Sequence, residues 1–202
     1  MIKFLCISDN FDPKPPNFYE LGGITPSIKL NRNQLEIVEK LITKWLSMMN
    51  FQNSILHFEA RFNPKLEENF SLMPIEINPR LGGCETWSNL KASSNIDFIR
   101  EHLNICLGIE VNLNKDVCKF RSISKNFLVT NYSLEDVRLN IEKLANDDVI
   151  EFVIFKPINK IFKSNENIGW ISIRNKNDLN EEQLIAKLDE NLKNLILMNK
   201  KI

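Results

Sequence analysis

Polar side chains suited to binding a metal ion and phosphate recur at every second position in residues 73–83, MPIEINPRLGG. Glu76, Asn78 and Arg80 are two residues apart, so an extended strand would direct all three to the same side. Carboxylate and amide oxygens are hard ligands, which Mg²⁺ accepts together with water and phosphate oxygens. The planar fork of an arginine binds phosphate or carboxylate through two parallel hydrogen bonds. The spacing therefore indicates a face for a metal ion and an anion.

The strand that carries these residues needs a partner, and residues 55–62, ILHFEARF, have the same two-residue period. The short polar loop at residues 63–71 favours an antiparallel hairpin of the two strands. One side of this hairpin is expected to be apolar, with Leu56, Phe58, Ala60, Phe62, Ile75 and Ile77. The other side is expected to be polar, with His57, Glu59, Arg61, Glu76, Asn78 and Arg80.

A second interpretation of the alternation is structural. An antiparallel sheet with one solvated face alternates in the same way, and cross-strand pairs of glutamate and arginine there only increase solubility. The end of the strand favours a site, because Pro79 and the glycine pair Gly82-Gly83 interrupt the ladder and let a ligand or another backbone approach closely.

The segments before the hairpin read as a strand, a loop and a helix. Residues 3–8 are expected to form a short strand. Prolines and paired glycines predict a loop over residues 9–27, and loops of this length are often functional. Apolar residues spaced by three and four predict an amphipathic helix over residues 33–49, which would pack on the core.

The segments after the hairpin also predict a mixed α+β chain. Helices are expected at residues 85–91 and 96–107, the second beginning at Ser94 or Asn95 and ending at Gly108. From residue 117 onward the patterns predict strands at 117–123, 125–130, 149–156 and 169–174 and helices at 134–145 and 181–198.

The composition is that of an ordinary soluble globular protein of one large or two small domains, with 202 residues, 43% hydrophobic and 26% charged. Acidic and basic residues balance at 26 each, so no overall field favours nucleic acid or a membrane surface. Neither a signal peptide nor an apolar run of ~18 residues is evident, so we expect a cytoplasmic protein. The four cysteines lack metal or disulfide spacing and are expected to be free thiols: Cys6, Cys84, Cys106 and Cys118.

Four stretches of the sequence together resemble a known family. They are PPNFYELGGITPS at residues 15–27, HFEA at 57–60, IEINPRLGG at 75–83 and CETWSNLK at 84–91. In this pattern the chain is similar to ATP-grasp enzymes of the carboxylate–amine ligase type, which include bacterial L-amino acid ligases. The resemblance implies an ATP-grasp C-terminal subdomain of antiparallel sheet and helices over residues 1–110, followed by a small α+β module over residues 111–202.

The resemblance also implies a reaction and a set of site residues. ATP would phosphorylate a small-molecule carboxylate, and an amine would then displace phosphate from the acyl phosphate. Glu59, Glu76 and Asn78 would hold Mg²⁺, or Mn²⁺ in its place, against the ATP phosphates, and Arg80 would be the catalytic residue that binds the transferring phosphoryl group. Contacts to the substrates would come from Glu20, Gly22, Gly83, Glu85 and Trp87, although Trp87 could equally be a packing residue.

The chain matches only the C-terminal half of such an enzyme. The family's N-terminal half supplies a phosphate-binding lysine, much of the adenine pocket and a glycine-rich flap. A ligase whose N-terminal half is a separate chain, or lies outside this sequence, is therefore the leading interpretation, and the partner would be a second chain or a further copy in a homo-oligomer. An inactive ATP-grasp-derived binding or regulatory module and a truncated remnant remain the alternatives, and retention of Glu59, Glu76, Asn78 and Arg80 argues against a remnant.

Overall fold

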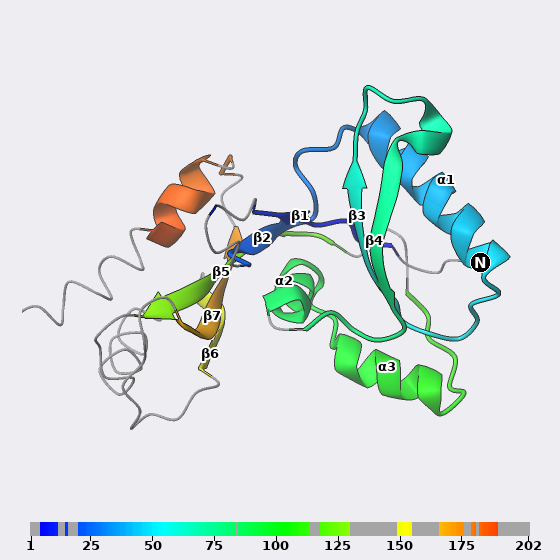
Figure 1. Ribbon diagram of the computed structural model, residues 1–202. Coiled ribbons are helices and arrows are strands. Elements are labelled where there is room, and N and C mark those ends of the chain that lie inside the picture. Colours follow the sequence, from blue (N-terminus) through cyan, green and yellow to red (C-terminus); the bar gives the residue numbers. More distant parts are fainter. Residues whose placement is uncertain are drawn as a thin grey trace, which may run out of the picture.

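The computed structural model contains two antiparallel sheets and several helices, which confirms the predicted α+β class (Figure 1). It describes residues 5–11, 15, 20–83, 85–113, 118–129, 149–154, 166–175, 179–180 and 182–189. In chain order the elements are β1 (Asp9–Asn10), β2 (Gly22–Thr25), α1 (Arg32–Met48), β3 (His57–Phe62), the 3-10 turn η1 (Glu68–Phe70), β4 (Leu72–Asn78), α2 (Glu85–Ser94), α3 (Phe98–Cys106), β5 (Arg121–Val129), β6 (Val149–Ile154) and β7 (Glu166–Asn175), followed by a helix over residues 182–189. No helix within these ranges is both long and apolar enough to cross a membrane.

The larger sheet has five antiparallel strands in the order β1-β2-β5-β7-β6, and α2 packs against β2, β5 and β7. The buried side of α2 consists largely of small residues such as Ser88, Ala92 and Ser93, which let the helix approach the strands closely. In this sheet β2, which precedes the predicted module boundary at residue 110, pairs with β5, which follows it. The division into modules 1–110 and 111–202 stays a prediction.

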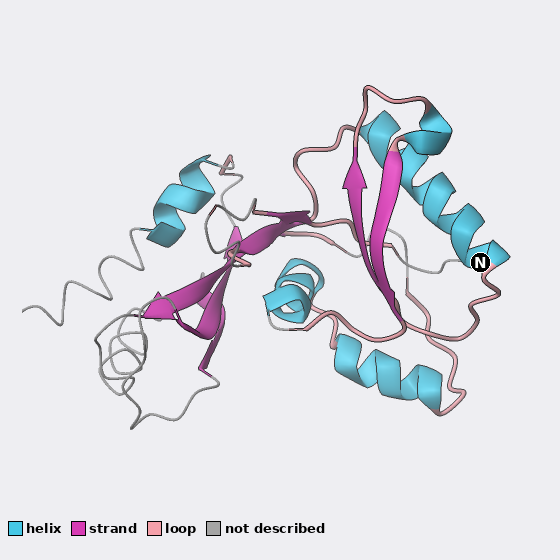
Figure 2. Cartoon of the chain, in the orientation of Figure 1, coloured by secondary structure: helices cyan, strands magenta, loops and turns pink. Residues whose placement is uncertain are grey.

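The smaller sheet is the hairpin β3–β4, which packs against α1 on one face (Figure 2). The predicted hairpin and the predicted helix are both confirmed. A capping box starts α1, in which Asn31 and Gln34 bond to each other's backbone N–H. The core between the layers is built around Val38, Leu41, Ile42 and Leu72. This packing sets the direction in which the opposite face of the hairpin points.

The predictions for the first segments were partly wrong. Residues 5–8 are not in a strand, and pairing begins only at β1. The predicted loop over residues 9–27 contains the buried strand β2, which lies between β1 and β5. Prolines and glycines obscured this strand, although the glycines are what allow its neighbours to approach. Residues 1–4, 12–14 and 16–19 lie outside the described part of the chain.

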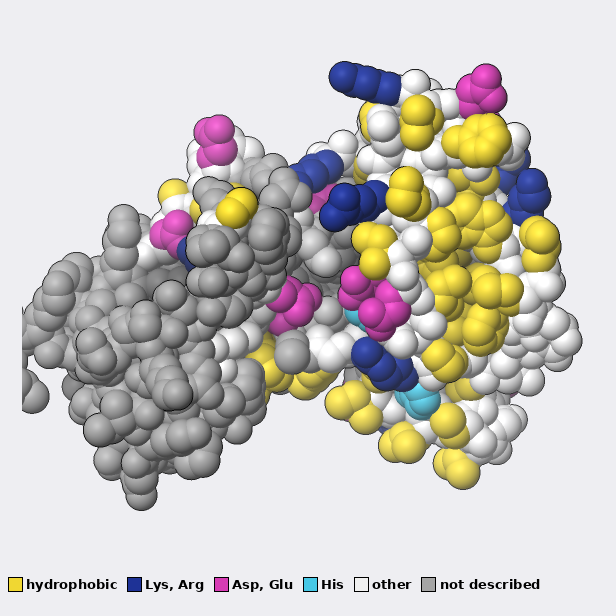
Figure 3. All heavy atoms as spheres, viewed as in Figure 1, with side chains coloured by type: hydrophobic (Ala, Val, Ile, Leu, Met, Phe, Trp, Pro, Cys, Tyr) yellow, Lys and Arg dark blue, Asp and Glu magenta, His cyan; other side chains and the backbone are white. Residues whose placement is uncertain are grey.

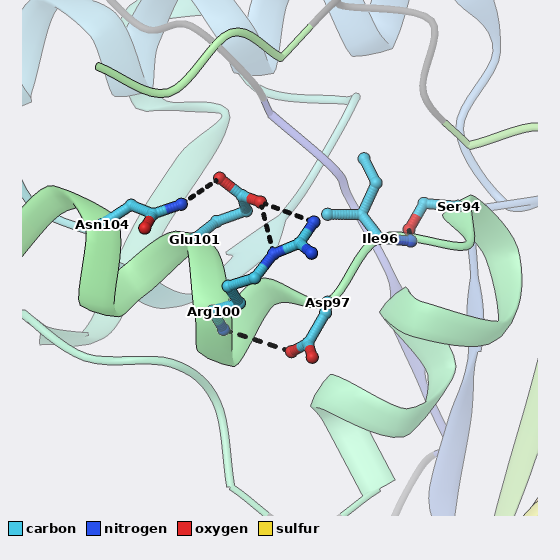
Figure 4. A network of polar contacts seen from close by, with 6 residues as sticks. All are labelled: Ser94, Ile96, Asp97, Arg100, Glu101 and Asn104. Carbon is cyan, nitrogen blue, oxygen red and sulfur yellow. Dashed lines mark hydrogen bonds and ion pairs between the residues drawn. The ribbon is translucent and has the colours of Figure 1, made fainter. Parts of the chain in front are cut away.

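Two boundaries in the second half also differ from prediction. The strands predicted at 117–123 and 125–130 are one strand, β5, with an irregularity between Phe127 and Leu128. The N-cap of α3 is Asp97, whose carboxylate accepts a bond from the Arg100 N–H at 3.1 Å (Figure 4). Asn95 cannot be this cap, because it follows α2 directly with a φ of 63°. The predicted helix at 134–145 lies outside the described residues.

The Trp45–Phe58 contact provides a test of the core between α1 and the hairpin. Their ring centroids are 5.9 Å apart, and Phe58 is half-buried against the core cluster. Phe58→Ala should therefore lower the free energy of unfolding by about 2 kcal/mol, below the value for a fully buried phenylalanine. Met73→Ala, at an exposed position of the same hairpin, should change it little. Urea denaturation of both variants would measure the difference, and equal losses would contradict this packing.

Candidate functional site

The register of the hairpin brings three predicted site residues, Glu59, Glu76 and Asn78, together with His57. His57 lies opposite Asn78, and Glu59 lies opposite Glu76. Directly opposed residues of an antiparallel pair have Cβ atoms about 5 Å apart on one face. We call these four residues the polar face. They come from two strands whose other side is held by the core, so the sheet positions them without help from a flexible loop.

A β-bulge breaks the predicted alternation just beyond the polar face. Glu59 pairs with Glu76 but Ala60 pairs with Pro74, so Ile75 has no partner opposite it. Ile75 is 59% exposed, whereas Ile77 pairs with Phe58 and is half-buried. The expectation that both isoleucines face the core was therefore wrong for Ile75. The bulge reverses the side to which the first half of β4 points.

The polar face offers oxygen ligands but few charges. Glu76 accepts a hydrogen bond from the Asn78 side-chain amide, and His57 Nε2 lies 3.8 Å from Glu59 Oε1. In the described part of the chain no three His, Cys, Asp or Glu side chains are grouped to hold a metal ion. Two carboxylates and one amide oxygen would suit Mg²⁺ only if water or phosphate completed its coordination.

Arg80 lies in the turn that follows β4. Its backbone N–H donates to the Asn78 carbonyl at 2.8 Å, which keeps the turn tight against the end of the strand. Its guanidinium Nη1 donates to the Leu81 carbonyl at 2.9 Å, and the side chain is exposed. The exposed fork has further N–H groups that could bind an anion near the polar face.

The glycine pair after Arg80 connects the polar face to the start of α2. A Cβ at Gly82 would lie 2.5 Å from Thr86 Cγ2 and 3.1 Å from His57 Cδ2, so only glycine fits there. A Cβ at Gly83 would meet nothing within 4 Å. The first glycine thus permits a close approach between the hairpin and α2. Between these two elements, acidic side chains lie beside a histidine (Figure 3).

Glu85, the first residue of α2, is only 4% exposed. Burial, together with the negative charge of Glu20, raises the pKa of its carboxyl to about 7. Bonds from its own backbone N–H and from the Asn126 side chain act in the opposite direction. Of the predicted substrate residues, Glu20, Gly22 and Glu85 all lie around this point, because the Glu20 carbonyl accepts the Asn126 amide at 3.0 Å and Gly22 pairs with Lys125 in the same strand.

Three buried acceptor atoms around Glu85 have no hydrogen-bond partner among the described residues: Glu85 Oε2, Asn89 Oδ1 and Asn126 Oδ1. We call them the acceptor cluster. The amide of Asn89 donates to Gly23 O at 3.0 Å and Ser124 Oγ at 2.8 Å, which leaves its oxygen unused. Buried acceptors normally have donors. A ligand with N–H groups, such as an amine, would supply them.

Sequence reasoning missed Asn126, whereas Asn89 lies in the stretch CETWSNLK that carries the family resemblance. A signal for Asn126 was present, because Ser122, Ser124 and Asn126 occupy every second position and therefore lie on one face of β5. The other two predicted substrate residues, Gly83 and Trp87, lie two residues before and two residues after Glu85. Gly83 is exposed, and the Trp87 ring lies under Lys91 Nζ, 5.6 Å from its centroid.

The chain matches no family model and no curated relative. Its fold is similar to that of an L-amino acid ligase from Bacillus licheniformis, with a TM-score of 0.66, 18% identity and coverage of 87% of this chain and 44% of that one. A carboxyaminoimidazole ribonucleotide synthase from Aspergillus clavatus complexed with ATP matches with a TM-score of 0.64, 12% identity and coverage of 93% and 45%.

A third similar structure is the biotin carboxylase domain of Hydrogenobacter thermophilus 2-oxoglutarate carboxylase, solved with MgADP, ADP and bicarbonate. It has a TM-score of 0.54 and 14% identity, with coverage of 86% of this chain and 38% of that one. All three are ATP-grasp enzymes, so the predicted resemblance is confirmed for the fold. The chain spans less than half the length of each of them.

Proposed function

We propose that this chain is the C-terminal half of an ATP-dependent carboxylate–amine ligase that works through an acyl phosphate. The observation that carries the proposal is the hairpin register, which pairs Glu59 with Glu76 and His57 with Asn78. This polar face occurs in a fold that is similar to an L-amino acid ligase over most of the chain. A solvated sheet would need no such grouping next to a turn arginine and a buried carboxyl.

In this proposal Glu59, Glu76 and Asn78 hold the metal ion. Bound Mg²⁺, or Mn²⁺ in its place, would neutralise phosphate charge and orient the nucleotide. Arg80 is the catalytic residue and binds the phosphoryl group through its exposed guanidinium. Its backbone is bonded to that of Asn78, two residues earlier in the chain. His57 lies beside Gly82, at the point where the hairpin approaches α2. Catalysis is then mainly positioning and neutralisation of charge.

The acceptor cluster would bind the amine substrate. Its three oxygens have no donor among the described residues, and an amine would bring N–H donors in both its charged and neutral forms. A carboxyl with a pKa of about 7 can also hold the proton that an amine loses when it attacks. Glu85 Oε2 is the atom we assign to this step. Amino acids are the substrate class favoured by the ligase with the similar fold.

The other half of the site would come from a segment outside this sequence, on the same or a separate polypeptide, or from a second copy of this chain. Several large apolar side chains of the hairpin and of the end of α1 are exposed, and apolar side chains spread over this part of the surface (Figure 3). The exposed side chains include Met48, Met49, Phe51, Phe70, Met73 and Ile75. Exposed apolar surfaces of this kind commonly mark protein interfaces. A binding module without catalysis is the alternative function, favoured by the presence of only two carboxylates on the polar face.

Calorimetric titration with ATP, with and without Mg²⁺, tests the proposed metal site. Glu76→Gln should weaken Mg²⁺-dependent ATP binding by about tenfold to 100-fold, since one charged metal ligand is lost. Its melting temperature should change little, because Glu76 is exposed.

Glu67→Gln is the matched control for that titration. Glu67 lies at the start of η1 in the same hairpin loop, where its side chain makes no capping bond. The Glu67→Gln variant should bind Mg²⁺ and ATP as tightly as the unaltered chain does. The metal assignment would be refuted if ATP binding by the unaltered chain did not depend on Mg²⁺. It would also be refuted if Glu76→Gln and Glu67→Gln bound ATP equally well in the presence of Mg²⁺.

A further inference from the structure

Two cysteines that are 112 residues apart in the sequence meet in the fold. The Sγ atoms of Cys6 and Cys118 are 3.1 Å apart. Both side chains are half-buried, so small molecules can reach them. A disulfide bond is ~2 Å long, and a displacement of about 1 Å would therefore join the two sulfurs. Both are free thiols, as expected, but no sequence pattern indicated that they lie next to each other.

The surrounding backbone fixes both thiols. Next to Cys6, the Ile7 carbonyl accepts the Ser27 N–H at 2.6 Å. Near Cys118, the Phe120 N–H donates to the Ser93 carbonyl at 3.0 Å. Both segments are thus tied to the body of the protein beside the cysteines. The thiols are preorganised for reaction with each other, which lowers the entropic cost of bringing them together.

The two thiols differ chemically. The Ser93 hydroxyl lies 3.5 Å from Cys118 Sγ and can donate to it. Hydrogen bonds from Cys6 and Ser93 lower the pKa of Cys118 to about 7, although burial opposes the shift. The bond to Cys118 and burial raise the pKa of Cys6. Because the Ser93 hydroxyl can donate to its thiolate, we assign Cys118 as the nucleophile of the pair and Cys6 as its proton donor.

We propose that Cys6 and Cys118 form a redox modification site that reacts with small disulfides of the glutathione class and closes to an intramolecular disulfide. The Cys118 thiolate attacks one sulfur of oxidised glutathione, breaks its S–S bond and releases one glutathione thiolate. Cys6 gives its proton to solvent, attacks the Cys118 sulfur of the mixed disulfide and releases the second glutathione. The cysteines lose two electrons, which reduce one oxidised glutathione to two reduced molecules.

Equilibration of the full chain with graded mixtures of reduced and oxidised glutathione at neutral pH tests this site. After acid quenching and alkylation, peptide mapping by mass spectrometry should show the Cys6 and Cys118 peptides linked, with a loss of two hydrogens. Mapping also separates these peptides from those of Cys84 and Cys106. The link should form at a more reducing ratio than any adduct at Cys106, an exposed cysteine on α3.

Three variants make the result specific. Cys6→Ser keeps a donor for Cys118 but removes the second thiol, so a glutathionyl adduct should accumulate at Cys118. Cys118→Ser should leave Cys6 unmodified, and Cys106→Ser should still form the linked peptide. The proposal is overturned if the unaltered chain accumulates a Cys118 adduct without the link. It is equally overturned if Cys118 in Cys6→Ser is no more reactive than Cys106.

Discussion

Gly22→Ala should lower the free energy of unfolding by about 4 kcal/mol. The Cβ of an alanine there would lie 2.2 Å from the carbonyl oxygen of Ser124 and 2.9 Å from Lys125 Cα, both backbone atoms of β5. The φ of Gly22 is +115°, where a residue with a side chain is strained. Backbone strain and overpacking each cost about 1–3 kcal/mol. Neither can relax without breaking the pairing of β2 with β5.

Gly83→Ala is the control for this substitution. Its Cβ would meet nothing within 4 Å, so stability should change by less than about 1 kcal/mol. Urea denaturation followed by circular dichroism would compare the two variants. A Gly22→Ala protein as stable as Gly83→Ala would contradict the close pairing of β2 with β5. A large loss of stability would also mean that the backbone conformation alone explains the glycine at position 22, which was predicted to contact the substrate.

Glu85→Gln should stabilise the protein above neutral pH by about 3 kcal/mol. Below about pH 4.5 the carboxyl is protonated in both the folded and the unfolded chain and contributes no difference. As the pH rises from 4.5 toward about 7 the unfolded chain loses its proton first, because burial raises the pKa in the folded state. Stability therefore falls through this window, and the loss is complete above about pH 7. Each pKa unit corresponds to about 1.4 kcal/mol.

The measurement is the free energy of unfolding of the unaltered chain and of Glu85→Gln at a series of pH values. The two should agree at low pH and diverge as the pH rises. Glu67→Gln, which alters an exposed carboxylate, should follow the unaltered chain throughout. A gap that does not change with pH would contradict a raised pKa at Glu85.

A buried carboxyl that destabilises the protein at neutral pH favours a functional explanation. Buried glutamates without full hydrogen bonding are uncommon, and displaced pKa values concentrate at binding and catalytic sites. In the proposed ligase, the amine would supply donors to Glu85 Oε2 and recover part of this cost. An amine that binds there should thus raise the melting temperature of the unaltered chain more than that of Glu85→Gln.

The sequence by itself determined the elements whose pattern is local. The three- and four-residue spacing of apolar side chains predicted α1, because one stripe of a helix must be buried against a core. The alternation in residues 55–62 and the short loop after them predicted the hairpin, and with it a shared polar side for Glu59 and Glu76. Their direct pairing depends on the bulge. The family resemblance, read from short motifs, predicted the fold that the similar structures share.

Only the tertiary structure decided features that depend on contacts between distant segments. The bulge that exposes Ile75 arises from the fit of two strands, which no two-residue period encodes. The stretch that read as a loop holds β2, because its glycines fit against the neighbouring strands β1 and β5. The acceptor cluster and the Cys6–Cys118 pair likewise need α2, β5 and the first segment to meet. These contacts between distant segments depend on how the layers pack, so a local sequence pattern does not predict them.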